Sequence, residues 1–245
     1  MRNIRIYSPE PLVVGASLDL PESAARHIAQ VLRLTAGSEL TLFDGSGLEY
    51  TGIIESATKS RVTVRLGVAL SGVTESALRI CLWHGLCRSD RMDSVIQKAT
   101  ELGVTEFQPV ITERDVVRLD VKRATRKLEH WRGIAISACE QSGRVRLPLL
   151  HPVATLGQCL QAFAANQNSA ATALMFDPEG TPGLRRHLLP QQDVFVLTGP
   201  EGGFSAKERA VAQEAGFSLV SLGPRILRTE TAPVVILSVV QSTLG

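Results

Sequence analysis

The chain has 245 residues, 44% of them hydrophobic, which is enough for packed cores in about two domains. No apolar run reaches the roughly 18 residues of a membrane span, and the first residues lack the apolar core of a signal peptide, so we expect a cytoplasmic protein without membrane segments. Four scattered cysteines without C-x-x-C spacing, and five histidines without an i, i+4 pair, argue against a metal site or a disulfide framework and favour free buried thiols.

The first seventy or so residues read mostly as β-strand. Strands are expected over residues 4–7, 39–43, 49–54 and 61–65, and one helix over residues 23–33 interrupts them. In the last of these strands polar and apolar residues alternate, as in a half-buried strand. We therefore predict a small β-barrel or sandwich as a first domain over residues 1–72.

The polar stretch 71–76 is expected to be the linker, and after it strands and helices alternate. The pattern predicts strands over 80–86, 107–111, 173–176, 194–197 and 217–222, and helices over 92–102, 121–141 and 232–244. Such alternation is typical of a mainly parallel sheet covered by helices on both faces. The second domain, residues 73–245, is therefore predicted to be α/β.

Although the formal net charge is only +2, positive charge is concentrated in one segment. Residues 114–146 hold nine basic and four acidic side chains, and Arg118, Lys122 and Arg126 share one helix face. The stripe fits either a surface that faces a polyanion or a solvated basic helix. In the first domain, candidate nucleic-acid contacts are Arg26, His27 and Arg33.

Two glycine-bearing stretches near the end of the chain each follow a predicted strand and precede a helix. The first, residues 198–203, leads into Ser205-Ala-Lys-Glu208, which has the spacing of a helix capping box. The second, residues 222–232, leads to Pro233, which only a first helical turn accepts. Glycine allows a ligand to approach the main chain closely. Each stretch alone also fits an ordinary tight loop, whereas the pair predicts a ligand pocket built from backbone.

Ligands of open α/β sheets gather at the carboxyl ends of the strands, where both glycine loops lie. Residues 85–91 follow the strand over 80–86, so Arg88 and Arg91 are expected near the same crevice, and the end of the long helix, with Glu140 and Arg144, is expected to reach it. A solvated surface cluster is the alternative for the charged residues of the second loop.

Six stretches together resemble one family across essentially the whole chain: residues 5–7, 27–33, 91–104, 138–144, 198–203 and 222–232. This is the RsmE family of bacterial small-subunit ribosomal RNA uridine N3-methyltransferases, within the SPOUT class. The resemblance implies a PUA-like β-barrel that helps grip RNA and a SPOUT domain whose C-terminal part forms a trefoil knot. It also implies a homodimer that uses S-adenosylmethionine and methylates N3 of uridine 1498 in 16S ribosomal RNA. Arg88 stands where many members have lysine.

By position, the family's cofactor loops fall on the two glycine loops and on the end of the strand over 173–176. The resemblance thus implies a cofactor-binding set made of Phe176, Pro178, Thr198, Gly199, Pro200, Glu201, Gly202, Gly203, Leu222, Gly223, Ile226, Leu227, Arg228, Glu230, Thr231 and Ala232. The RNA-binding candidates are Arg26, His27, Arg33, Arg118, Lys122, Arg126 and Arg144.

Methylation at uridine N3 requires loss of the weakly acidic imide proton, which leaves negative charge on the ring. An arginine can stabilise that charge, with Arg228 as the first candidate and Arg88 or Arg91 next. Candidate proton acceptors are Glu140, Glu201 and Glu230. Each has a structural alternative: Glu201 can hold its own loop, Glu230 can favour the N-terminus of the last helix, and Glu140 can pair with Arg144.

Two other functions stay open at this point. One is another SPOUT RNA methyltransferase, acting on a ribose or a different base, and the other is a non-catalytic RNA-binding or ribosome-assembly factor. A nucleoside-triphosphate enzyme is disfavoured because the sequence has no G-x-x-x-x-G-K-[ST] motif.

Overall fold

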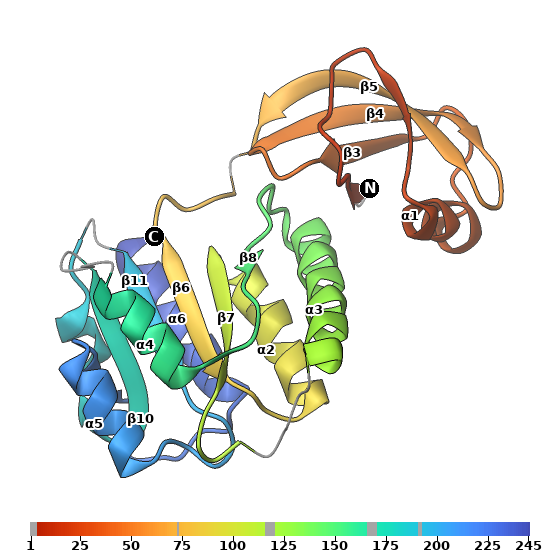
Figure 1. Ribbon diagram of the computed structural model, residues 1–245. Coiled ribbons are helices and arrows are strands. Elements are labelled where there is room, and N and C mark those ends of the chain that lie inside the picture. Colours follow the sequence, from red (N-terminus) through yellow and green to blue (C-terminus); the bar gives the residue numbers. More distant parts are fainter. Residues whose placement is uncertain (1–3, 73, 116–120, 166–170, 191–192) are drawn as a thin grey trace. The chain divides into compact units, whose positions relative to one another are not determined.

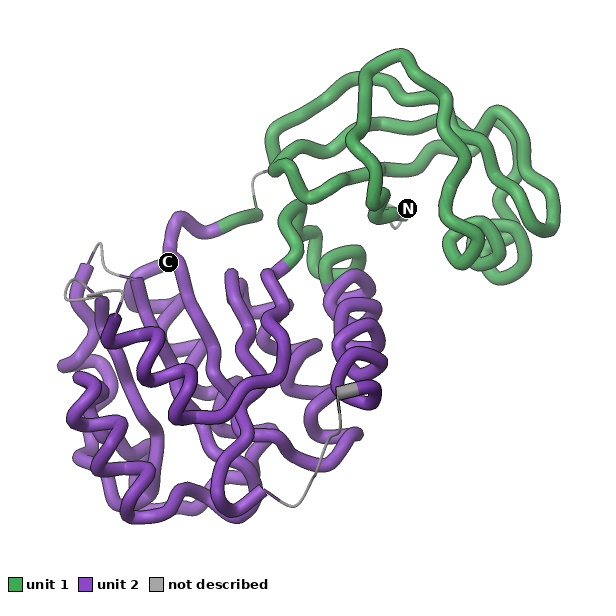
Figure 2. The backbone as a smooth tube through the Cα atoms, in the orientation of Figure 1, with its two compact units in different colours: residues 1–75, 139–147 green, residues 76–138, 148–245 purple. Residues whose placement is uncertain are grey.

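The computed structural model describes residues 4–72, 74–115, 121–165, 171–190 and 193–245, and the chain divides into two compact units (Figure 2). Unit 1 comprises residues 1–75 and 139–147, and unit 2 comprises residues 76–138 and 148–245. The predicted domains meet at 72/73, close to the first break in this division. Sequence patterns did not predict that residues 139–147 belong to unit 1.

Unit 1 is built on a five-stranded sheet with the order β1-β3-β4-β5-β2 (Figure 1). Its strands and helices are β1 (Arg5–Tyr7), β2 (Ser17–Asp19), α1 (Glu22–Arg26), the π-helix η1 (His27–Leu32), β3 (Glu39–Phe43), β4 (Leu48–Ala57) and β5 (Val62–Ser71). The short β1 pairs parallel to β3, and the other pairings are antiparallel. All the predicted elements are present, although the last strand runs to Ser71 and the helix ends as π-helix.

A buried ion pair attaches the segment 139–147 to the rest of unit 1. The Glu75 carboxylate accepts hydrogen bonds from the Arg144 guanidinium at 3.0 Å and from the backbone N–H groups of Val145 and Arg146, each at 3.0 Å. The Arg144 residue is only 4% exposed. Since a buried arginine needs a paired, hydrogen-bonded partner, Glu75 fixes where this segment lies within the unit.

Unit 2 contains a parallel sheet with the order β12-β10-β11-β6-β7-β8, to which β9 adds by pairing with β7. The strands are β6 (Ile80–Gly85), β7 (Glu106–Ile111), β8 (Leu149–Leu150), β9 (Ala154–Thr155), β10 (Thr172–Pro182), β11 (Val194–Thr198) and β12 (Ser218–Ser221). The helices are α2 (Ser89–Glu101), α3 (Val121–Ser142), α4 (Leu156–Ala165), the 3₁₀-helix η2 (Leu184–His187), α5 (Ala206–Glu214) and α6 (Thr231–Leu244).

Both faces of this sheet are buried, each in its own core. Along β6, Ile80 and Leu82 pack in one core with residues of α2, α3 and α6. Cys81 and Trp83 point to the other core, which α4 and α5 cover. Alternating side chains of a strand face opposite sides of the sheet, so a strand buried on both sides is apolar throughout. The predicted α/β architecture with helices on both faces is confirmed, and the trefoil knot implied by the family resemblance stays a prediction.

The ends of β6 and β11 lie unusually close together. The two strands pair in register up to His84 and Thr198. Beyond this pair, a Cβ atom built on Gly85 would lie 2.6 Å from the backbone nitrogen of Pro200. The absence of a side chain at Gly85 is therefore what allows the first glycine loop to fold over the end of β6.

No helix in the described part of the chain is long and apolar enough to cross a membrane. All four cysteines are buried free thiols, as predicted from their spacing.

The close approach of the Pro200 backbone to Gly85 leads to a prediction about the stability of a Gly85 variant. Gly85→Ala should lower the free energy of unfolding by about 1–3 kcal/mol, because the new methyl group overlaps the Pro200 backbone. Gly133→Ala is the matched control: Gly133 lies within α3 with open space around its Cβ position, and alanine there should stabilise by about 0.5–1 kcal/mol. Urea unfolding measures both, and equal stabilities for the two variants would contradict the packing at Gly85.

Candidate functional site

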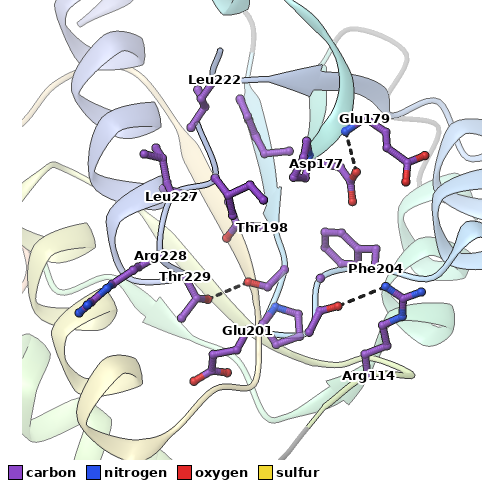
Figure 3. A pocket seen from close by; sticks show the side chains of 18 of the residues that line it. Arg114, Asp177, Glu179, Thr198, Glu201, Phe204, Leu222, Leu227, Arg228 and Thr229 are labelled. Carbon is purple, nitrogen blue, oxygen red and sulfur yellow. Dashed lines mark hydrogen bonds between the residues drawn. The ribbon is translucent and has the colours of Figure 1, made fainter. Parts of the chain in front are cut away.

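A pocket of about 520 Å³ lies at the carboxyl ends of β10, β11 and β12, between the two glycine loops (Figure 3). This volume lies within the usual range of small-molecule sites. Its wall includes most residues from Thr198 to Phe204 and from Leu222 to Thr229, together with residues 176–179 in the middle of β10. The position agrees with the expectation that ligands gather at this edge of the sheet.

The first loop is held by the start of α5. Ser205 caps the helix by accepting from the Glu208 N–H at 3.1 Å, and the Glu208 carboxylate accepts from the Ser205 N–H at 2.8 Å, which is the predicted capping box. The same carboxylate accepts from the Glu113 N–H at 2.8 Å. Glu208 therefore connects the first loop to the segment that follows β7. Gly203 has φ 63°, a conformation that favours glycine.

Arg114 lies on that segment and reaches the pocket. Its guanidinium donates to the Gly202 carbonyl at 3.3 Å (Figure 3). Beside it, burial raises the pKa of the Asp115 carboxyl to about 6, although hydrogen bonds from the Thr112 hydroxyl and N–H oppose that rise. The segment after β7 thus adds a cation to the first loop.

The second loop turns at Gly223, which has φ 105°, and ends at α6. Before the helix, the Thr229 hydroxyl donates to the Gly199 carbonyl of the first loop at 2.8 Å (Figure 3). A Cβ atom at Gly203 or Gly223 would meet no atom within 4 Å, so the main chain at both positions borders open space. Pro233 is buried in the first turn of α6, where a proline was predicted to fit.

The middle of β10, where its pairing with β11 ends at Phe176, supplies an apolar and acidic part of the pocket wall. Phe176 and Pro178 line it, and between them the Asp177 carboxylate lies 3.5 Å from the Arg209 guanidinium. Arg209 also pairs with Glu179 at 2.9 Å. Arg209 therefore holds two carboxylates beside the apolar surface of Phe176.

Arginines and glutamates form a connected group at the other side of the pocket. The Glu201 carboxylate accepts from the Arg91 guanidinium at 3.2 Å and from the Arg88 N–H at 3.3 Å, so it also sits at the N-terminus of α2. Glu230 lies 3.8 Å from Arg91 and 3.9 Å from Arg228. Arg91 is thus fixed between two carboxylates, while the Arg228 side chain is 78% exposed.

Most of the cofactor-binding residues implied by the resemblance line this pocket. They are Phe176, Pro178, Thr198, Gly199, Pro200, Glu201, Gly202, Gly203, Leu222, Gly223, Ile226, Leu227, Arg228 and Ala232. Glu230 and Thr231 do not line it. Glu230 is instead the N-cap residue of α6, which matches the structural alternative considered for it. Arg91 lines the pocket, and Arg88 meets it only through its N–H bond to Glu201.

Sequence reasoning missed several charged or polar residues of the pocket: Arg114, Asp177, Glu179, Arg209, Arg225 and Thr229. Asp177 and Thr229 lie within stretches whose neighbours were identified, so position alone could have found them. Arg209 lies four residues after the capping serine, on the face of α5 that meets the loop. Arg114 follows the end of β7, and no local sequence pattern marks it as a pocket residue. Its position depends on the contact between the neighbouring Glu113 N–H and the distant Glu208 carboxylate.

Glu140 and Arg144 belong to unit 1 and are not among the residues that line the pocket. The Glu140 carboxylate accepts from the Tyr7 N–H at 3.0 Å. Burial raises the pKa of Glu140, and the Tyr7 hydrogen bond opposes that rise. The prediction that Arg144 contacts RNA is wrong, because its guanidinium is buried against Glu75 and cannot reach a phosphate without breaking that pair.

The other RNA-binding candidates are exposed where the structure describes them. Lys122 and Arg126 are exposed on α3, and Arg118 lies outside the described residues. In unit 1, Arg26, His27 and Arg33 are all exposed at α1 and η1 or directly after them. These positions leave the predicted basic face of α3 accessible.

Comparison with known families gives two matches along the chain. Residues 74–241 match the model of an RNA methyltransferase domain, and residues 20–67 match that of an RNA methyltransferase PUA domain. The second match agrees with the PUA-like β-domain predicted for unit 1.

Individual relatives cover almost the whole chain. The Ribosomal RNA small subunit methyltransferase E of Synechocystis is 32% identical over 98% of this chain and 77% of its own length. A Neisseria gonorrhoeae protein of the same name, solved bound to S-adenosyl methionine, is 38% identical with a TM-score of 0.91 and covers 100% of this chain and 99% of its own. A Legionella pneumophila protein solved with the bound cofactor SAM is 39% identical with a TM-score of 0.93 over 100% of this chain and 99% of its own. The chain therefore belongs to the ribosomal RNA small subunit methyltransferase E family.

Proposed function

We propose that this protein uses S-adenosylmethionine to methylate N3 of uridine 1498 in 16S ribosomal RNA. The observation that carries the proposal is the pocket between two glycine loops, in a chain of this family whose solved relatives bind this cofactor. The choice of base and position rests on the resemblance of the sequence motifs to the uridine N3-methyltransferases. A substrate in the ribosome also supports a cytoplasmic location.

The pocket fits S-adenosylmethionine in size and in chemistry. The main chain at Gly203 and Gly223 borders open space, and Phe176, Leu222 and Leu227 offer apolar surface for an adenine ring. Polar backbone groups of the two loops would hold the base edge and the methionine part. When bound, the cofactor supplies an electrophilic methyl group on its sulfonium, so the chain must position a nucleophile next to it.

Among the three candidate arginines, Arg228 is the best placed to stabilise a uracil anion. Arg91 is already engaged by Glu201 and Glu230 at 3.2 and 3.8 Å, and the Arg88 residue meets the site through its backbone. The Arg228 guanidinium is exposed at the pocket edge, and its ion pair with Glu230 is long, at 3.9 Å. Its donors are therefore available to the uracil carbonyl oxygens, where negative charge develops as N3 loses its proton.

Of the candidate carboxylates, Glu230 has the fewest hydrogen bonds among the described residues, although it is not one of the residues that line the pocket. Its Oε2 atom is buried and has no hydrogen-bond partner among the described residues. Glu201, by contrast, already accepts from the Arg88 N–H and the Arg91 guanidinium. A carboxylate oxygen without a donor keeps a lone pair free for a proton, so the local contacts favour Glu230 as base and Glu201 as a structural group.

A homodimer is proposed as the working form, on the basis of the family resemblance. Ile226, in the second loop, is 85% exposed, and a dimer contact would cover it. Sedimentation equilibrium at micromolar concentration tests the dimer directly.

The proposed reaction can be tested on small ribosomal subunits from cells that lack the enzyme. We expect tritiated methyl transfer from S-adenosylmethionine to 16S ribosomal RNA, with mass spectrometry placing the methyl group on N3 of uridine 1498. A methyl group on a ribose or on another base would replace this proposal with a different RNA methyltransferase. Tight RNA binding without any methyl transfer would indicate a non-catalytic assembly factor.

Removal of the Arg228 guanidinium should slow chemistry more than cofactor binding. For Arg228→Ala we expect single-turnover methylation to fall by about 10²–10³, the usual loss for one donor to a developing anion. Arg185→Ala removes an exposed arginine that does not line the pocket and is the matched control. An unchanged single-turnover rate in Arg228→Ala would remove this residue from the mechanism.

RNA affinity should depend strongly on salt through the exposed basic face of α3. Lys122→Ala and Arg126→Ala should each reduce the slope of log affinity against log salt by about 1, since each removes one phosphate contact. Lys207→Ala, which removes an exposed lysine on α5, should leave the slope unchanged. Filter binding to 16S ribosomal RNA across a salt series measures the slopes, and identical slopes for all these variants would refute the role of α3.

A further inference from the structure

A buried histidine lies directly behind the pocket wall, outside the set of residues that line it. His84 is the penultimate residue of β6, is 0% exposed, and pairs in register with Thr198 of β11. Its Nδ1 atom lies 2.7 Å from the Thr198 hydroxyl, and its Nε2 atom lies 3.4 Å from the Thr229 hydroxyl. One imidazole thus contacts one residue from each loop of the pocket.

The hydrogen-bond partners determine where the imidazole proton lies. The Thr229 hydroxyl donates to the Gly199 carbonyl at 2.8 Å, so its oxygen faces His84 as an acceptor. The Thr198 hydroxyl has one proton and two acceptors in reach, Nδ1 at 2.7 Å and the Trp83 carbonyl at 3.4 Å, and the shorter contact assigns the proton to Nδ1. Nε2 therefore carries the imidazole proton and donates to Thr229. The bonds form one chain from Thr198 through His84 and Thr229 to Gly199, and this chain begins and ends in the first loop.

The His84 imidazole in this row of hydrogen bonds is uncharged. Burial lowers the pKa of His84 to about 3, because the interior disfavours the imidazolium. A neutral imidazole has one donor and one acceptor, which is what the two threonines require of it here. The nearby Cys87 sulfur, 3.7 Å from Nε2, is a much weaker partner.

We propose that His84 is a positioning residue that fixes the spacing between the two cofactor loops. The inference rests on the proposed use of S-adenosylmethionine, because the loops would bind the two sides of that molecule. Without the imidazole, Thr198 and Thr229 lose their common partner, and the direct bond from the Thr229 hydroxyl to the Gly199 carbonyl is left to hold the two loops without its support. The cofactor must then order the loops as it binds, which weakens its affinity.

Two conservative substitutions of His84 test its hydrogen bonds to Thr198 and Thr229 one at a time. His84→Asn can place an acceptor near the Nδ1 position and keep the Thr198 bond alone. His84→Gln can place a donor near the Nε2 position and keep the Thr229 bond alone. His84→Ala loses both. Thr100→Val is the control, because it removes a buried hydroxyl that bonds the Ile96 carbonyl within α2 and does not line the pocket.

Calorimetry with S-adenosylmethionine and amide hydrogen exchange of the free protein give independent readouts. We expect His84→Ala to weaken binding at least tenfold and to speed exchange in residues 199–203 and 223–231. His84→Asn should speed exchange mainly in the second loop, and His84→Gln mainly in the first. Thr100→Val should lower the melting temperature without changing the dissociation constant.

Three results would overturn the proposal. The first is binding by His84→Ala within twofold of the unchanged protein, and the second is exchange in both loops that stays unchanged in the Ala, Asn and Gln variants. The third is affinity that simply follows melting temperature across all variants, Thr100→Val included, which would reduce His84 to a packing residue. If the unchanged protein binds no S-adenosylmethionine, the proposed function fails, and the exchange pattern still decides whether His84 holds the loops together.

Discussion

The parallel pairing of β6 with β11 determines the geometry of the whole pocket. This pairing brings the ends of two strands together that are more than a hundred residues apart in the chain, and it sets His84 beside Thr198. From that point Gly85 lets the first loop fold inward, and Thr229 ties the second loop to the first. The pocket is therefore an extension of the strand register, and a shift of one residue would turn these side chains to the opposite face.

The arginines of the pocket differ in how closely carboxylates hold them. Arg209 is held by Asp177 and Glu179, and Arg91 by Glu201 and Glu230, so these arginines are structural crosslinks as much as ligand-binding groups. Arg228 stays exposed and weakly paired at the edge. Arginines held by close carboxylates have fewer donors free for a substrate, so the exposed Arg228 and Arg225 of the second loop are more available than Arg91 and Arg209.

Local sequence patterns predicted the longer strands, the capping box at Ser205 and a pocket at the two glycine loops, because these depend on neighbours along the chain, whereas the individual lining residues came from the family resemblance. The short strands β2, β8 and β9 were not predicted. Local patterns also failed where position depends on a distant contact. Arg114 reaches the pocket only because Glu208 binds the segment beside it, and Arg144 is buried because Glu75 lies opposite. The roles of His84 and Thr229 likewise require the register of strands that no local pattern specifies.

The pairing of Glu75 with Arg144 has a consequence for how this chain can be divided. Residues 139–147 complete unit 1. A fragment that ends at Glu75 would therefore lose the partners of the Glu75 carboxylate and the Val145 side chain that covers Gly72. Such a fragment would expose an unpaired carboxylate and a patch of apolar surface. Each unit therefore contains two separate segments of the chain, and no single cut yields both units complete.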